Sequence, residues 1–176
     1  MTLTHWTPED LASRVDEVLS VYAEAMGYPP EVARMRHGFV VSHSQREGLR
    51  AVAVTAADDR LLGFGYGYLG GPGQWWHDQV GEWLTPEAYR RWMSDVFELV
   101  ELQVRPEAQG RGLGARLLTE LLGDAPGSTV VLSTPEADEA KSRAWRLYRR
   151  TGFVDLARHR LFPGDDRPFA ILGRDL

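Results

Sequence analysis

The chain has no cysteine among its 176 residues. Disulfide bonds, thiolate metal sites and a cysteine nucleophile are therefore excluded, and a reducing compartment such as the cytoplasm suits the chain. It also lacks a run of about 18 apolar residues, the minimum for a membrane-spanning helix, and its first residues, MTLTHWTPED, do not follow the basic-then-apolar order of a signal peptide. We expect a cytoplasmic protein with no membrane partner.

Basic residues are fewer than acidic ones, and lysine is almost missing. The chain has 20 Lys and Arg against 25 Asp and Glu, a formal net charge of -5, and Lys141 is its single lysine. This balance argues against nucleic acid as a partner and favours cationic ligands. Hydrophobic residues make up 43% of the chain, which suffices for a full core, so we expect one domain over residues 1–176.

The stretch from Phe97 to Leu122 is the part around which the chain is organised. Phe97 to Val104 is rich in β-branched and large apolar residues and predicts a strand, which Pro106 ends. Strict alternation would place two carboxylates on opposite faces of that strand. One face would carry Glu98, Val100, Leu102 and Val104, and the other Phe97, Leu99, Glu101 and Gln103.

A glycine-rich turn follows the strand and opens into an amphipathic helix. Gln109 to Gly114 carries three glycines at alternate positions, so its backbone can approach a ligand closely and turn its N–H groups toward one point. The helix has a stripe of five leucines, Leu113, Leu117, Leu118, Leu121 and Leu122. Its positive N-terminal end meets the turn, which suits a phosphate or pyrophosphate. The simpler alternative is a tight turn with close packing, and the Walker and dinucleotide spacings do not fit.

Two motifs resemble those of a known family. Val104-x-Pro106-x-x-Gln109-Gly110-x-Gly112-x-Gly114 resembles the acyl-CoA signature of the GNAT N-acetyltransferases, and Ala144-x-x-Leu147-Tyr148-x-x-x-Gly152-Phe153 resembles their second motif. The resemblance implies acetyl-CoA as acyl donor, with its pyrophosphate on the turn and its pantetheine arm along the preceding strand. The residues implied to bind it are Leu102, Gln103, Val104, Gln109, Gly110, Arg111, Gly112, Leu113, Gly114, Ala115 and Tyr148. Lys141 stands where the family often has an asparagine that contacts pantetheine.

The resemblance also implies the fold class, an α/β (α+β) domain of GNAT type. It would have a mixed, mostly antiparallel sheet flanked by helices and splayed at the central strand, with its acyl-CoA-binding core at about 97–153. The patterns predict strands over 2–6, 50–56, 61–69, 129–133, 154–162 and 168–173, and helices over 8–26, 31–44 and 139–150. The inward residues expected on the last two helices are Val32, Met35, Phe39 and Val40, and Ala140, Ala144, Leu147 and Tyr148.

The chemistry of acetyl transfer needs an acid and a base. An ammonium must lose a proton before it attacks a thioester, and the departing thiolate benefits from a proton donor. The resemblance implies that Tyr148 is this donor. Glu98 occupies the position at which histone-type members place a glutamate base, and Glu101 or a water chain are the alternatives.

Residues 70–94 form a tryptophan-rich insertion with four of the six tryptophans. So long a connection is more often functional than idle. Trp75, Trp76, Asp78 and Glu82 are candidate walls of a site for a cationic amine, through indole faces and carboxylates. The alternatives are a cap over the edge of the core or a homodimer contact. His77 lacks a spaced partner for metal binding, so we interpret it as structural and expect no metal.

These features together predict an acetyl-CoA-dependent N-acetyltransferase that acts on a primary amine. The first candidate partner is a small-molecule amine, a cationic metabolite or an antibiotic-like compound. A protein or peptide acceptor, through its N-terminus or a lysine, is the second. Two other classes stay open: a catalytically silent acyl-CoA-binding regulatory domain, and an interaction module whose interface is the tryptophan-rich insertion.

Overall fold

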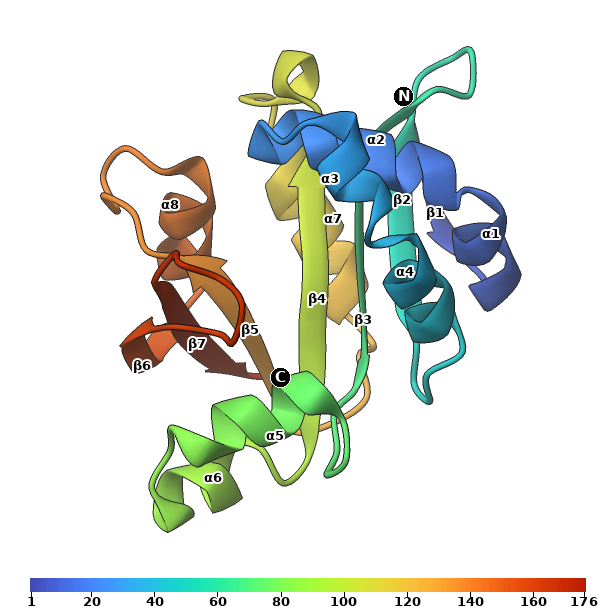
Figure 1. Cartoon of the computed structure of the whole chain (residues 1–176). Helices are drawn as coiled ribbons and strands as arrows, with labels where there is room; N and C mark the ends of the chain where they lie inside the picture. Colours follow the sequence, from blue (N-terminus) through green and yellow to red (C-terminus); the bar gives the residue numbers. More distant parts are fainter. The chain divides into compact units, whose positions relative to one another are not determined.

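The computed structural model describes residues 1–176, which divide into two compact units (Figure 1). Unit 1 comprises Met1–Tyr68 and Leu99–Ala125, and unit 2 comprises Leu69–Glu98 and Pro126–Leu176. Strand β4 (Val96–Val104) begins in unit 2 and continues into unit 1. No helix in either unit is both long enough and apolar enough to cross a bilayer.

Unit 1 begins with strand β1 (Thr2–Trp6), helix α1 (Pro8–Ser13) and helix α2 (Val15–Met26). A capping box starts α1. The Thr7 hydroxyl accepts from the Asp10 N–H at 3.1 Å, and the Asp10 carboxylate accepts from the Thr7 N–H at 2.9 Å. The predicted strand and helix start are therefore confirmed.

The expected single helix up to Met26 is instead two helices that meet at Arg14. This residue leaves the helical region, with φ -107° and ψ 20°. Its guanidinium donates to the Glu17 carboxylate at 3.0 Å and to the Asp59 carbonyl at 2.7 Å. These contacts, one of them to a residue 45 positions away, fix a break that local helix periodicity does not encode.

The second predicted helix is also divided, into α3 (Pro30–Arg34) and α4 (His37–Ser44). The expectation that Val32, Met35 and Phe39 point inward was wrong, because all three are exposed, Met35 by 80%. Ala33 and Val40 are the buried hydrophobic residues of these two helices. The chain turns between the helices, so one helical periodicity does not run through residues 31–44.

Strands β2 (Arg50–Thr55) and β3 (Leu61–Leu69) form the predicted antiparallel hairpin. Asp59 lies in its turn with φ +65°, a conformation that aspartate tolerates better than most residues. The hairpin and the helices α1, α2, α3 and α4 share one apolar cluster. It contains Leu11, Val15, Val18, Leu19, Val21, Tyr22, Ala23, Ala33, Val40, Ala51, Ala53, Leu61, Phe64 and Tyr66.

Helix α7 (Leu113–Leu122) closes unit 1, and all five leucines of its predicted stripe are buried. It follows a 3-10 turn at Pro106–Ala108. Two glycines of β3 allow close packing here. A Cβ on Gly63 would lie 2.9 Å from the Gln103 carbonyl oxygen, and one on Gly65 would lie 3.4 Å from a methyl group of Leu121.

The alternation predicted for β4 is interrupted near Val100. This residue packs against the apolar cluster of α2. Leu102 and Val104 lie instead beside Gly65 and Gly63, on the side of α7. Val100 and Leu102 therefore do not share a face as strict alternation requires, an irregularity of the kind that a β-bulge introduces.

In unit 2, the tryptophan-rich insertion folds into α5 (Trp75–Glu82) and α6 (Pro86–Trp92). The Thr85 hydroxyl caps α6 by accepting from the Ala88 N–H at 3.2 Å, and α5 was not predicted. Both helices contribute to an apolar cluster. Its buried members are Val80, Met93, Val96, Val131, Ala157, Phe162 and Ile171, and Trp76, Trp83, Leu84, Tyr89, Trp92, Leu156 and Phe169 pack against them.

The rest of unit 2 comprises β5 (Thr129–Pro135), α8 (Arg143–Arg150), β6 (Val154–Arg160) and β7 (Phe169–Asp175). These strands match the predicted ones to within a few residues. Strand β7 pairs antiparallel with both β5 and β6.

Helix α8 begins four residues later than expected, because Asp138 organises the chain before it. The Asp138 carboxylate accepts from the Ala140 N–H at 3.0 Å, and its carbonyl accepts from the Ser142 N–H at 2.9 Å. Ser142 then caps the helix at the Trp145 N–H. Ala140 and Ala144 are consequently exposed, against expectation, and the fully buried residue is Trp145.

The strands follow the order β1-β2-β3-β4-β5-β7-β6 in a mixed sheet of seven strands flanked by helices, which confirms the predicted fold class. Strands β4 and β5 pair in parallel over Val96–Glu98 and Thr129–Val131, within unit 2. The ladders β1–β2, β2–β3, β5–β7 and β6–β7 are antiparallel. The splay expected at the central strand stays a prediction.

Candidate functional site

The glycine-rich turn of unit 1 has the backbone geometry that its sequence suggests. Gly110 and Gly112 both have φ +77°, the left-handed region that favours glycine. A Cβ at either residue would meet no atom within 4 Å. Backbone conformation, not crowding, therefore requires glycine here, and the space beside the turn is open. The Gln109 amide donates to the Val104 carbonyl at 2.9 Å, which ties the turn back to β4.

The N-terminus of α7 opens directly from this turn. Gly112 is the N-cap, and its carbonyl accepts the helical hydrogen bond of the Arg116 N–H at 3.1 Å. The amides of Leu113, Gly114 and Ala115 precede that bond and have no acceptor one helical turn back. Arg111 is exposed on the turn. Free N–H groups, a positive helix end and a guanidinium together suit an anionic diphosphate.

Glu101 is a buried carboxylate on β4, held from two sides. Arg36 Nη2 donates to its Oε1 at 2.9 Å, and Gln103 Nε2 donates to its Oε2 at 3.0 Å. Its side chain is 10% exposed. Burial raises the pKa of the Glu101 carboxyl, and the charge of Arg36 and the hydrogen bond from Gln103 offset part of that rise.

His43 of α4 lies in the same unit, among tyrosines of β3. Its Nδ1 is 3.1 Å from the Tyr66 hydroxyl, and its ring is 5.2 Å from that of Tyr68. Burial, together with the charges of Arg46 and Arg36, lowers the pKa of His43 to about 4. The imidazole is therefore neutral near pH 7. No motif in the sequence singled out Arg36 or His43 as candidate functional residues.

Unit 2 contains the other two predicted catalytic residues. Glu98 is buried at the last pair of the parallel ladder, opposite Val131. Tyr148 is buried on α8, and its ring packs edge-on against Phe153 at 5.5 Å, which fixes the plane of the ring. Lys141, at the position of the family's asparagine, is exposed and pairs with Asp138 at 3.4 Å.

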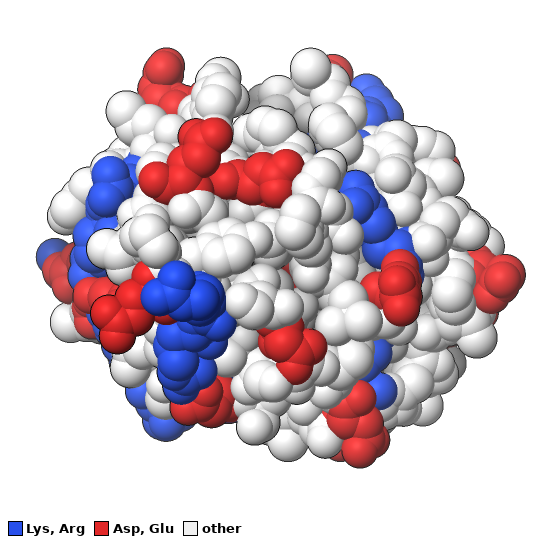
Figure 2. Space-filling view, turned by 90° about the horizontal axis from the view of Figure 1, so that it is seen from below, with Lys and Arg blue, Asp and Glu red and all other residues white.

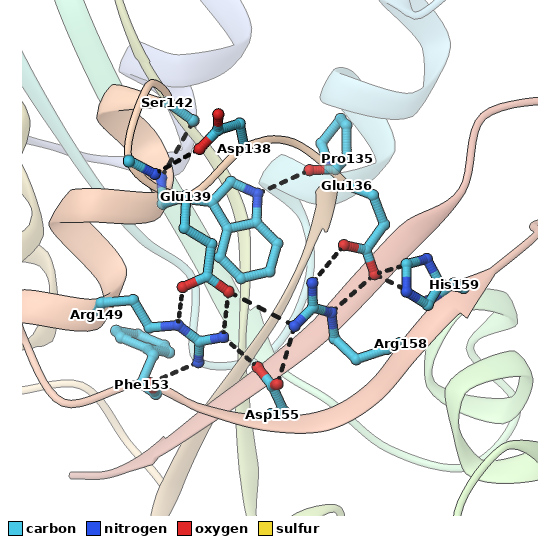
Figure 3. Close-up of polar contacts among 12 residues, drawn as sticks. Pro135, Glu136, Asp138, Glu139, Ser142, Arg149, Phe153, Asp155, Arg158 and His159 are labelled. Carbon is cyan, nitrogen blue, oxygen red and sulfur yellow. Dashed lines mark hydrogen bonds and ion pairs between the residues drawn. The ribbon is translucent and has the colours of Figure 1, made fainter.

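A charged network positions α8 in unit 2 (Figure 3). Arg149 donates to Glu139 at 2.8 Å and to Asp155 at 2.6 Å, and Arg158 donates to Glu136 at 2.7 Å and to Asp155 at 3.0 Å. The two guanidiniums lie 5.0 and 4.8 Å from the ring of Trp145. The hydrogen bonds from Arg158 lower the pKa of Glu136 to about 2. Each charge has an opposite partner, so the network is structural.

The four predicted site residues of the tryptophan-rich insertion have different surroundings and different partners. Trp75 is 59% exposed and lies 5.6 Å from Phe162. Trp76 instead donates from its indole to the Ser133 hydroxyl at 3.1 Å and joins the apolar cluster. Asp78 accepts from the Gly73 N–H at 3.1 Å, and Glu82 accepts from Gln79 at 3.3 Å.

His77 in this insertion has a structural position. It is fully buried, its Nε2 is 3.0 Å from the Met93 carbonyl, and its ring meets Tyr89 edge-on at 5.7 Å. Because a carbonyl only accepts, Nε2 carries the proton and donates to it. The histidine thus links α5 to the residue that follows α6, as the sequence interpretation expected.

The described chain has no group of three or more His, Cys, Asp or Glu side chains placed to hold a metal ion. On the face shown in Figure 2, acidic and basic side chains are interspersed, and neither sign forms one continuous patch. That face therefore lacks the broad basic field on which a polyanion binds.

The predicted site residues fall in both units. The turn, residues 102–104 and Glu101 belong to unit 1, and Glu98, Tyr148 and the four insertion residues belong to unit 2. Within unit 1, the structure brings Glu101 and Gln103 together and adds Arg36. Within unit 2, it gives Trp76 a structural partner and leaves Trp75 at the surface.

A mixed sheet with β4 and β5 in parallel, a glycine turn at a helix N-terminus and a motif tyrosine on the helix after β5 are the features expected of the acyl-CoA N-acyltransferase class. The model of the Acetyltransferase (GNAT) family matches residues 15–153. The chain therefore belongs to the GNAT acetyltransferase family, which confirms the resemblance and the enzyme class.

A relative from Mycobacterium tuberculosis carries the name GCN5-like protein acetyltransferase. It is 42% identical over an alignment of 195 positions, which covers 96% of this chain and 95% of the relative. Two solved structures share the fold. A GNAT-family protein from Desulfovibrio desulfuricans has a TM-score of 0.67 at 21% identity, with 99% of each chain covered. Ribosomal-protein-alanine N-acetyltransferase from Brucella melitensis has a TM-score of 0.66 at 16% identity, with 100% of each covered.

Proposed function

We propose that the protein transfers the acetyl group of acetyl-CoA to a primary amine of a protein or peptide. The observation that carries the donor assignment is the turn at Gly110 and Gly112, with its left-handed backbone, the open space beside it and the N-terminus of α7. The donor would place its pyrophosphate on the amides of Gln109 to Ala115 and pair it with Arg111. Bound there, acetyl-CoA supplies the acetyl group as a thioester.

The residues of the chain then move protons. A carboxylate of β4, Glu98 or Glu101, takes a proton from the acceptor ammonium, directly or through water, and the N–H electron pair stays on nitrogen. That nitrogen bonds to the acetyl carbon as the carbon–sulfur bond breaks. Tyr148 gives its hydroxyl proton to the departing thiolate. The surplus proton on the new amide nitrogen and the proton held by the glutamate both pass to solvent, and the tyrosinate regains one proton from solvent. The reaction therefore releases one proton net, and both side chains return to their starting forms.

The acceptor class rests on the relative that is 42% identical over nearly the whole chain, because that relative is called a protein acetyltransferase. The alignment covers 96% of this chain and 95% of the relative, so the similarity is not confined to the acyl-CoA-binding core. Val32 of α3, Met35 in the following turn and Phe39 of α4 are exposed apolar residues. They also suit a partner larger than a metabolite, since exposed apolar patches mark interaction surfaces.

A thiol-release assay with acetyl-CoA tests the donor and the acceptor together. Protein and peptide substrates with free lysines or N-termini are compared with polyamines, aminoglycosides and amino acids. We expect turnover with a protein or peptide amine, and acetylation at a defined residue by mass spectrometry. Calorimetric binding of acetyl-CoA without turnover of any amine would instead identify the catalytically silent alternative.

A small cationic amine is the second candidate acceptor. The formal net charge of -5 and the exposed indole of Trp75 favour it, because both attract a cation. Saturable turnover of a polyamine or an aminoglycoside, at a kcat/KM above that of every peptide, would select this candidate over the first.

A further inference from the structure

Arg36 lies at the junction of α3 and α4, where its backbone is fixed on both sides. Its N–H donates to the Ala33 carbonyl at 2.9 Å, and its carbonyl accepts from the Val40 N–H at 3.1 Å. The side chain extends from this junction to β4, where it meets Glu101 at 2.9 Å. The two residues are 65 positions apart in the sequence.

The guanidinium is held by a ring as well as by the carboxylate. Its Cζ lies 4.8 Å from the centre of the Tyr22 ring, a cation–π distance. Gln103 occupies the other oxygen of Glu101 at 3.0 Å. Both carboxylate oxygens thus have a donor, so the orientation of the Glu101 side chain is determined from two directions.

The surroundings of Glu101 would otherwise favour its protonated form. Its side chain is 10% exposed, whereas that of Arg36 is 37% exposed. Burial penalises the ionised carboxyl, and an opposite charge within about 4–6 Å favours it. The other titratable and charged groups of this region, which comes from α2, α4 and β3, are Tyr22, His43, Arg46 and Tyr66. His43 is neutral near pH 7, so Arg36 is the cation in direct contact with Glu101.

We propose that Arg36 is a positioning residue for acetyl transfer, which keeps the Glu101 carboxylate ionised and oriented to take the proton of the acceptor amine. This inference rests on the proposed function, and it selects Glu101 over Glu98 as the base. Arg36 does not touch the reacting atoms. It acts through Glu101, by charge and by hydrogen bonding.

The variants that test this role are Arg36→Gln, which removes the charge, and Arg36→Lys, which keeps it. Arg34→Gln is the matched control, since Arg34 lies two residues away, is 67% exposed at its side chain and pairs only with Glu31 at 3.5 Å. Circular dichroism and thermal melting confirm that each variant folds.

Two measurements are made on each protein across pH. The first is kcat/KM for a short lysine peptide, with thiol release from acetyl-CoA as the signal. The second needs no activity: it is the titration of glutamate side-chain carbons by NMR, with Glu101 assigned from the signal that disappears in Glu101→Gln.

In Arg36→Gln, we expect the Glu101 titration midpoint and the acid limb of the kcat/KM profile to move together to higher pH, by about 1 to 3 pH units. Below the new midpoint the rate falls about tenfold for each pH unit. Arg36→Lys should bring the titration midpoint and the rate profile most of the way back to those of the parent. Arg34→Gln should match the parent in both. A residue with only a structural role would lower the melting temperature and leave the pH profile in place.

Three results would overturn the inference in distinguishable ways. An unchanged midpoint in Arg36→Gln would show that Arg36 does not keep Glu101 ionised. A shifted midpoint with an unshifted rate profile would remove Glu101, and Arg36 with it, from the reaction. If the parent acetylated no amine at all, the proposed function would fail together with the positioning role, whatever the NMR titration showed.

Discussion

Glu98 and Glu101 are three residues apart on one strand and meet different surroundings. Glu101 is bonded to Arg36 and Gln103 in unit 1. Glu98 lies in unit 2, buried beside the parallel ladder of β4 and β5. A general base must reach the ammonium and must be ionised when it does so. The contact of Glu101 with Arg36 supplies the second condition, through a cation that the sequence motifs did not indicate.

Separate substitution of the two glutamates distinguishes the candidate bases. Glu101→Gln should lower kcat by about 100- to 10,000-fold, the usual contribution of a general base, with little change in acetyl-CoA affinity. Glu98→Gln should lower it less. Steady-state kinetics measure kcat, and calorimetry measures the affinity for acetyl-CoA. A larger loss in Glu98→Gln would restore the first choice that the sequence resemblance suggested.

Tyr148→Phe tests the proton donor. The phenylalanine keeps the edge-on contact with Phe153 and removes the hydroxyl, so cofactor affinity should stay near that of the parent. We expect a loss in kcat of about 10- to 1,000-fold, because the hydroxyl matters most as charge develops on sulfur. Tyr89→Phe, in the insertion, is the control. A parent-like kcat for Tyr148→Phe would assign the acid role to water.

At the scale of single elements, we expect acetyl-CoA binding to be sensitive to a single substitution in the turn before α7. Gly112→Val should abolish acetyl-CoA binding in calorimetry, because a β-branched residue is strained at φ +77° and its side chain would enter the open space beside the turn. Gly164→Val is the matched control. Gly164 has φ +84° and equally open surroundings, but lies in the turn between β6 and β7.

The two variants separate backbone strain from ligand binding. Both should lose stability to a similar extent, by about 1 to 3 kcal/mol, and only Gly112→Val should lose acetyl-CoA. Should a folded Gly112→Val protein bind acetyl-CoA with parental affinity, the pyrophosphate is not on this turn.

Helix α8 is held by the charged network of Figure 3. We therefore expect the stability of the protein to depend on pH in the acid range. The Arg158 contact lowers the pKa of Glu136 from 4.5 to about 2. A depressed carboxyl pKa stabilises the folded state above about pH 4.5, and this contribution is lost as the pH falls toward 2. Arg158→Ala should lower Tm at pH 7 by about 2 to 8 °C, for a loss of roughly 1 to 2 kcal/mol at a partly exposed network.

The difference in Tm between the parent and Arg158→Ala should narrow between pH 4.5 and 2, because the parent loses the same contribution there. Differential scanning calorimetry over this range measures it. Arg160→Ala, at the exposed end of the same strand, is the control and should match the parent. A constant difference across the range would show that Arg158 acts through its packing on Trp145 and not through Glu136.

For the molecule as a whole, substitutions in the tryptophan-rich insertion test whether it serves the acceptor site, the core or a homodimer interface. Trp76 is tied to Ser133 and packed in the cluster of unit 2, whereas Trp75 is mostly exposed. Trp76→Ala should therefore lower Tm more than Trp75→Ala. Trp75→Ala should instead raise the acceptor KM with little effect on that of acetyl-CoA. If Trp75→Ala had the kinetics of the parent but light scattering showed a monomer in place of a dimer, the exposed indole would be part of a homodimer interface.

Much of the fold followed from the sequence, because its signals are local. The Thr7–Asp10 capping box, the leucine stripe of α7 and the hairpin between β2 and β3 depend on residues close together in the chain. The left-handed glycines at 110 and 112 are local too. The order of these elements, with two motifs at their family spacing, was sufficient to assign the fold class and the family.

The tertiary structure decided what depends on residues distant in the chain. The helix break at Arg14 is fixed by a contact with Asp59, and the environment of Glu101 is determined by Arg36, 65 positions before it. Burial among α4 and β3 makes His43 a neutral residue. The free energy of ionising a side chain depends on how water is excluded and which charge stands beside it, and neither is set until the chain has folded.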